Sequence, residues 1–192
     1  MTQLEYRDYM HSLAVNLKDI ANNPDKNDRF FEIVQSKDEV TGAWDEDFEN
    51  ALKSRINITG GKCVMVLEAM HEKFQGSQQA RNVKSVPYGC FMLLKKAVTG
   101  KSNYTARQVS QSIAESGTAA KKVLCWIEAD TAKRYNGGGD IRTAMLIDWN
   151  ELVISPIGPI VDGMVGVRVD FTFMTPSSKP FVYDLNDWTI PL

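Results

Sequence analysis

Hydrophobic and polar residues alternate strictly near the end of the chain, from residue 165 to residue 174. One set of positions is apolar: Val165, Val167, Val169, Phe171 and Phe173. The other set contains Gly166, Arg168, Asp170, Thr172 and Met174. A period of two with β-branched and aromatic residues predicts a strand that buries one face.

The segment before this strand predicts a second strand and a long connection. Residues 152–154 form a short apolar run, and several turn-forming residues follow it: Pro156, Gly158, Pro159, Asp162 and Gly163. A tight hairpin needs only about two residues between its strands. We therefore expect a C-terminal strand hairpin whose connection, residues 155–164, is longer than the hairpin requires.

Helical spacing appears in two places. In residues 3–20 one stripe is apolar, and it consists of Tyr6, Met10, Leu13, Leu17 and Ile20. Thr2 and Glu5 have the spacing of a capping box, and residues 22–24 predict the end of this helix. A longer helix is predicted for residues 105–135, with a second capping box at Thr105 and Gln108. Gly117 leaves open a kink or two separate helices, and residues 136–139 end the pattern.

Three further segments predict strands. Residues 30–34 are a short candidate, and residues 62–69 favour a buried strand, with a helix through Met70 and Phe74 as the alternative. Residues 86–98 predict a long strand whose Pro87 and Gly89 fit an edge or a bulge. The polar residues 70–85 between the two long strands predict an extended hairpin arm or a loop.

These elements together predict a single α+β domain over residues 1–192. Its sheet is expected to be mostly antiparallel, with an N-terminal helix, a long central helix and the C-terminal hairpin. Residues 36–61 are acidic and predict a solvated loop or a short helix, since they lack the ligand order of an EF-hand. The tail, residues 176–192, carries Phe181, Tyr183, Trp188 and Ile190, which we expect to dock on the body or on a neighbouring subunit.

Composition argues against several classes of protein but does not indicate a ligand. The net charge of −2 and the pI near 5.7 give no electrostatic case for binding nucleic acid or an anionic membrane. Cys63, Cys90 and Cys125 lie far apart in apolar stretches, which favours reduced thiols and synthesis inside a cell. The first ten residues lack the apolar core of a signal peptide, and no apolar run approaches the roughly 18 residues of a membrane span.

A search for catalytic chemistry finds no complete site. His11 and His71 have no partners at metal-binding or triad spacing. The glycines at 137–139 follow a helix instead of preceding one, which is the wrong polarity for a phosphate loop. Glu68 is the one carboxylate inside an apolar strand: it is either a buried acid or, as we favour, lies at a strand end or pairs with a lysine. We expect no enzyme activity, no cofactor and no metal.

The order of elements resembles the tail-terminator and tail-completion proteins of tailed bacteriophages and the related neck-ring proteins. The local likeness lies in residues 63–68 (CVMVLE), 91–96 (FMLLKK) and 157–168, which contain the pattern GP-x-x-D-x-x-x-G. The resemblance implies a small subunit whose sheet is flanked by two helices. It also implies assembly into a ring that closes the tail tube or joins it to the head.

The resemblance therefore predicts a structural virion protein, made in the host cytoplasm, that forms a homo-oligomeric ring of six or more copies. Its partners would be other neck or tail-tube proteins, with no membrane and no specific nucleic-acid site. The candidate interface residues are Pro156, Ile157, Pro159, Ile160, Asp162, Met164, Phe74, Gln78, Phe181, Tyr183 and Trp188. Two alternatives remain: a small α/β adaptor or binding protein, and an enzyme with an unrecognised site near Glu68 or the acidic segment.

Overall fold

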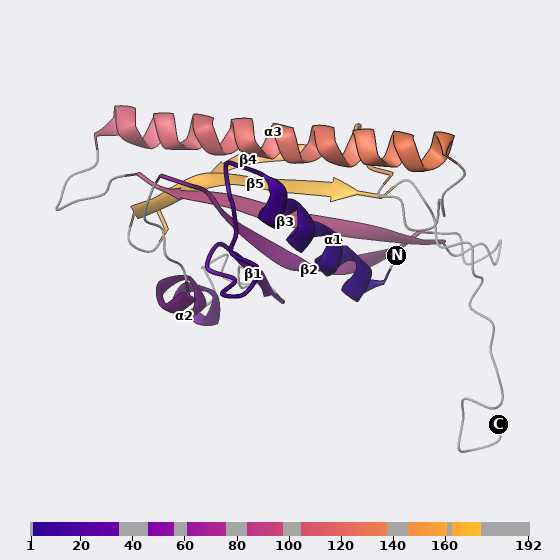
Figure 1. Cartoon of the computed structure of the whole chain (residues 1–192), viewed down its shortest axis with the longest axis horizontal. Coiled ribbons are helices and arrows are strands. Elements are labelled where there is room, and N and C mark those ends of the chain that lie inside the picture. The colour runs from indigo at the N-terminus through magenta and orange to yellow at the C-terminus, as the bar shows by residue number, and fades with distance from the viewer. Residues whose placement is uncertain are drawn as a thin grey trace, which may run out of the picture.

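The structure, a computed structural model, describes residues 2–34, 46–55, 61–75, 84–97, 105–137, 146–160 and 163–173 (Figure 1). The helices in this part of the chain are α1 (Gln3–Asn16), α2 (Glu46–Arg55) and α3 (Ala106–Asn136). The strands are β1 (Phe30–Ile33), β2 (Val64–Gln75), β3 (Lys84–Lys96), β4 (Val153–Ile157) and β5 (Met164–Thr172).

The strands form one five-stranded sheet in the order β1-β2-β3-β5-β4. β1 pairs with β2 in parallel, and every other pair is antiparallel. β3 lies at the centre, where Phe91 faces Leu67 of β2 and Val169 of β5 in the register. The predicted α+β class, the mostly antiparallel sheet and the C-terminal hairpin are confirmed.

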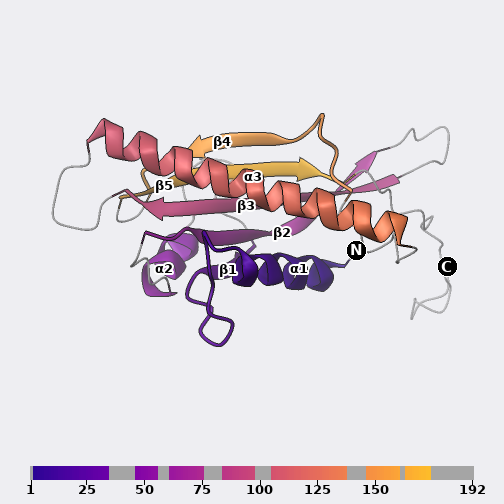
Figure 2. The same cartoon turned by 45° about the horizontal axis from the view of Figure 1, so that its top comes forward.

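Both predicted helices lie on the same face of the sheet, as Figure 2 shows most clearly. This face is apolar because it receives alternate residues of each strand. Its main cluster joins α1 and α3 to the sheet through buried side chains that include Tyr6, Met10, Val123, Ile127, Met65, Leu67, Phe91, Leu93, Val167, Val169, Phe171 and Phe173. The apolar set predicted for residues 165–173 faces these helices.

A smaller core lies on the opposite face, under α2. Phe48 and Leu52 of α2 are buried there against a cluster that also contains Phe31, Val64, Val66, Met92, Leu94, Ile160 and Met164. The acidic segment thus contributes a short helix with a buried side, which was one of the two outcomes predicted for residues 36–61. The other acidic residues of that segment, from Asp38 to Asp45, lie outside the described residues.

The predicted helix ends are partly corrected. α1 ends at Asn16 and not at residue 20, because Leu17 adopts an extended conformation at the C-cap. The chain then folds back, with the amide of Asn22 donating to the Ala14 carbonyl at 3.0 Å. Ile20 is buried from this turn, so the apolar stripe is correct although the helix is shorter. α3 is a single helix through Gly117, and both predicted capping boxes are present.

The two long strands reach further than predicted. β2 extends to Gln75 and β3 begins at Lys84, so the predicted arm continues the sheet as a two-stranded ribbon in these positions. β3 is central, so Pro87 and Gly89 do not mark an edge; the register shift lies on the facing strand, between Glu68 and His71. A Cβ at Gly89 would stand 2.6 Å from the ring of Phe171, so this glycine makes room for the aromatic core.

Candidate functional site

The hairpin connection is the first candidate, and the structure divides its residues into two groups. Pro156 and Pro159 are exposed and Ile157 is half-buried. Ile160 and Met164 are buried in the smaller core, at 8% and 1% exposure, and the Ile160 amide donates to the Met164 carbonyl at 2.8 Å. These two side chains belong to the core of one protomer, which explains their apolar character without a partner.

The other predicted interface residues are not brought together with the connection. Phe74 lies in β2, where its backbone is placed and faces Ser85 in the register, but its side chain is outside the described part. Asp162 and Gln78 lie outside the described residues, and the same is true of the tail residues Phe181, Tyr183 and Trp188.

The most organised polar site is a group of charged side chains on the sheet face that carries α2. Arg168 of β5 donates to both oxygens of Glu68 from its Nη1 and Nη2 atoms, each at 2.7 Å. Its Nε atom donates to the Asp170 oxygens at 2.9 and 3.0 Å. The Tyr88 hydroxyl donates to the same Asp170 carboxylate. The group thus joins the three adjacent strands β2, β3 and β5.

Glu68 is therefore a buried acid, at 4% exposure. The predicted strand end is wrong, because Glu68 lies inside β2, and the ion pair that the structure shows is with an arginine, Arg168. Arg168 was visible in the sequence only as a polar position of the alternation. The two residues are 100 positions apart, and only the pairing of β3 with both β2 and β5 brings them together.

Electrostatics favours one charge state for this group. Burial alone would lower the pKa of the Arg168 guanidinium, but its hydrogen bonds to Glu68 raise that pKa above the usual arginine value. Burial and the hydrogen bond to Asp170 raise the pKa of Tyr88, which stays a neutral donor. Burial, together with the Glu68 carboxylate, raises the pKa of the Cys90 thiol far above its ordinary value. A thiol held in the protonated form is a weak nucleophile.

The arrangement is suited to rigidity more than to catalysis. A planar guanidinium held by two carboxylates has few donors left for a substrate, and the neighbouring thiol is protonated. Among the described residues no group of three or more His, Cys, Asp or Glu side chains is placed to hold a metal ion. We interpret Glu68, Arg168, Asp170 and Tyr88 as a cross-strand charge network that fixes the register of the sheet.

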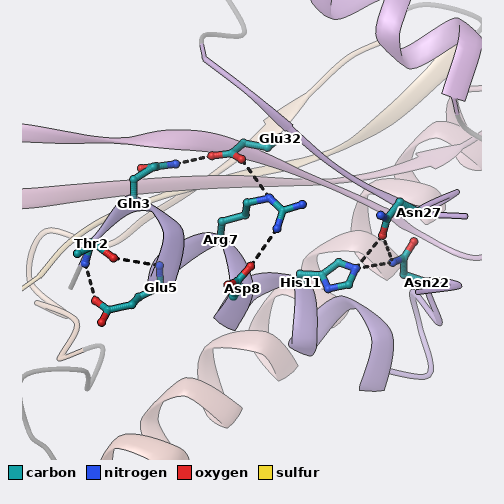
Figure 3. Close-up of polar contacts among 9 residues, drawn as sticks. All are labelled: Thr2, Gln3, Glu5, Arg7, Asp8, His11, Asn22, Asn27 and Glu32. Atoms are coloured by element: carbon teal, nitrogen blue, oxygen red, sulfur yellow. Dashed lines mark hydrogen bonds and ion pairs between the residues drawn. The ribbon is translucent and has the colours of Figure 1, made fainter. Parts of the chain in front are cut away.

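The polar side chains of α1 have structural roles as well (Figure 3). The Nε2 atom of His11 lies 2.7 Å from Asn27 Oδ1, and its ring meets Phe30 edge-on. Gln3 and Arg7 both contact Glu32 of β1, Arg7 at 3.4 Å. The structural interpretation of His11 is thus supported, while His71 lies in β2 beside Tyr88 in the register and not in a loop.

A groove between α1 and α3 was not predicted from the sequence. It has a volume of about 340 Å³, and its walls include Leu13, Leu17, Val123 and Trp126. Trp126 is 59% exposed, which is unusual for so large an apolar side chain. The available signal was a tryptophan next to the buried stripe of a helix whose outer face is otherwise polar.

A more polar cleft of about 470 Å³ continues this groove, since both are lined by Lys18 and Asp19. The cleft adds Lys62 and Lys95 from the strand side and Glu115 from α3. Several lysines are already engaged: Lys122 binds Asp19 at 2.7 Å, Lys62 donates to the Lys18 carbonyl at 2.6 Å, and Lys95 pairs with Glu115.

Comparison with models of known protein families, with curated proteins and with solved structures finds no match for this chain. In the part of the chain that the structure describes, no helix combines the length and the apolar composition that crossing a membrane requires.

Proposed function

We propose that this chain is a structural, non-enzymatic subunit that assembles head to tail into a ring of a tailed phage particle, at the neck or at the end of the tail. The order of elements and the quoted motifs support this proposal through their resemblance to the tail-terminator and neck-ring proteins. The chain would be made in the host cytoplasm and become part of the virion, in contact with other neck or tail-tube proteins.

The observation that carries the proposal is the distribution of exposed apolar side chains. Five large apolar residues of the described chain are exposed, and three of them lie at the two edges of the sheet. Val34, 77% exposed, follows β1 at one edge. Val153 of β4 and Trp149 before it, 52% and 49% exposed, lie at the other edge.

The two edges differ, as a ring requires. β1 is a four-residue strand that is parallel to its neighbour, whereas β4 is antiparallel to its neighbour and contains Pro156. A head-to-tail contact needs two different surfaces on one subunit, and it closes into a ring when the rotation between copies permits. The exposed Pro156 lies in β4 itself, and the exposed Pro159 follows the strand and extends that surface.

Sedimentation velocity of the purified chain tests the proposal directly. We expect a hexamer or a larger closed species, and we expect that Val34→Asp or Val153→Asp each reduces association at least about 10-fold, as charge at the centre of an interface does. Leu4→Asp is the matched control, because Leu4 is also an exposed apolar residue, at 64%, but lies on α1. A replacement of the hairpin connection, residues 156–163, would also test the interface, but it would remove Ile160 from the smaller core. The point changes at Val34 and Val153 avoid this effect on the core.

Mixing the two edge variants separates a head-to-tail contact from a symmetric one. Each variant keeps one intact edge, so the mixture should form heterodimers that cannot close. A wild-type chain that stays a monomer or dimer at every concentration, also when tail-tube protein is added, would contradict the proposal and favour a small adaptor protein. Association that is unchanged in both edge variants would show that the edges are not the interface.

A further inference from the structure

The groove between α1 and α3, together with the polar cleft that continues it, forms one surface with an apolar half and a basic half. The apolar half consists of the exposed Trp126 and the half-buried Leu17, and it lies over Val123, which is buried in the main core. We propose that this surface binds the C-terminal segment, residues 181–192, of a neighbouring copy. The inference rests on the proposed ring, which holds copies side by side.

The apolar half matches the composition of that segment. Residues 181–192 contain Phe181, Tyr183, Trp188 and Ile190 within twelve positions. Aromatic side chains bury large areas and commonly anchor interfaces in preformed apolar pockets. Trp126 in the wall of the groove offers such side chains a ring against which they can pack.

The basic half matches the charge of the segment. The cleft is lined by Lys18, Lys62 and Lys95 and by Asp19 and Glu115, a net charge of +1, and Lys122 in the groove brings the whole surface to +2. Residues 181–192 contain Asp184 and Asp187 and no lysine or arginine. Complementary charge of this kind steers association and fixes orientation more than it adds affinity.

The reach of the chain is sufficient. Phe173, the last described residue, meets the ring of Tyr6 near the beginning of α1, with centroids 6.1 Å apart. The groove begins near the other end of α1, about 16 Å away for the eleven residues from Tyr6 to Leu17. Residues 174–180 span up to about 23 Å when extended. This distance applies within one copy. The contact with a neighbour follows from the proposed ring, in which a tail exchanged between copies adds interface and a tail folded on its own groove does not.

Disulfide trapping on the full chain tests the assignment. In a Cys125→Ser background, one copy carries Ser12→Cys in the groove wall and a second copy carries Asn186→Cys in the tail segment. Under mild oxidation we expect covalent heterodimers at a rate at least about 10-fold above that of a control copy with Ser110→Cys, an exposed position of α3 outside the groove. Equal rates would overturn the proposal. A chain carrying both cysteines that links only to itself would overturn it too, because the tail would then fold on its own groove.

Complementation separates this inference from the ring itself. Trp126→Ala removes the exposed ring from the groove, and the double variant Phe181→Ser, Trp188→Ser removes two aromatic side chains from the tail. Each variant is expected to weaken association of the ring about 10-fold, with an unchanged melting temperature. A mixture of the two variants should recover part of the loss, since each supplies what the other lacks. Rings that form normally in both variants would refute the tail contact and leave the proposed function intact. A wild-type chain that never forms rings would refute the proposed function, and the trapping rate would then decide the tail contact alone.

Discussion

The face of the sheet under α1 and α3 is apolar from Phe30 near one edge to Ile154 near the other, whereas the face toward α2 is apolar at one end and charged at the other. Both faces come from the same alternating strands. The first is stabilised by packed rings, with Phe171 in ring contact with Tyr6, Phe91 and Phe173. The second combines a small core with a buried charge network. The difference shows that the polar side chains of an alternating strand can fix the pairing of strands as specifically as the apolar side chains on its other face.

The largest expected effect tests the apolar face. Phe171→Ala should lower the free energy of unfolding by about 4 kcal/mol, because it leaves a cavity among rings that central strands hold in place. Phe48→Ala, in the smaller core, should cost less, about 3 kcal/mol, since a short helix can shift to fill the space. Urea unfolding measures both, with Leu4→Ala, at an exposed apolar position of α1, as control. A larger cost at Phe48 would reverse the ranking of the two cores.

The next effect tests the charged part of the other face. Arg168→Met should lower the free energy of unfolding by about 3 kcal/mol, because it leaves the Glu68 carboxylate buried without its guanidinium. Adding Glu68→Leu should recover part of that loss, since the buried Glu68 carboxylate is then removed while Asp170 keeps its hydrogen bond from Tyr88. Arg107→Met, at an exposed position of α3, is the matched control. If Arg168→Met costs no more than this control, the network does not stabilise the fold.

The smallest effect concerns an ion pair beside the apolar face. Hydrogen bonds from Lys95, and then from Gln111, lower the pKa of Glu115. A lowered pKa means that the pair contributes stability above the ordinary glutamate pKa, about 4.3, and loses it as the pH falls through the folded value. Because Glu115 is partly exposed, at 42%, the contribution should stay below about 1 kcal/mol.

Unfolding of wild-type protein and of Glu115→Gln at pH 7 and at pH 2 checks this expectation. The two proteins should differ at pH 7, and the difference should shrink toward pH 2 as the Glu115 carboxylate takes up a proton. A difference that persists at pH 2 would show that the residue acts through packing and not through its charge.

Local patterns predicted most of the elements, because helical and strand periodicity depend on neighbouring residues. The stripe from Tyr6 to Ile20 identified the buried side of the first segment, but its helix ends at Asn16 because the fold-back at Asn22 depends on contacts within the loop. β2 and β3 extend over polar residues since each supplies the hydrogen-bond partners of the other. The composition of these polar segments does not indicate that β2 and β3 pair with each other there.

The candidate surfaces were harder to predict for the same reason. Glu68 attracted attention as a carboxylate in an apolar strand, but its partner Arg168 is defined by the order of strands in the sheet. Trp126 is exposed because of where α1 packs against α3, which no local pattern encodes. The order of strands likewise decides which residues lie at the two edges of the sheet, and the sequence alone did not give that order.

The single helix α3 has a mechanical consequence. At 31 residues it is about 46 Å long and runs lengthwise over the sheet, at a shallow angle to the strands, as Figure 2 shows. Its side chains are packed along it, from Ile113 to Ile127, so bending the sheet along this axis requires bending the helix as well. The subunit should therefore be stiff along α3 and more compliant across the strands, where rows of backbone hydrogen bonds and side-chain contacts between neighbouring strands resist a pull. A load applied to β1 or β4 would be carried first by their rows of hydrogen bonds to the rest of the sheet.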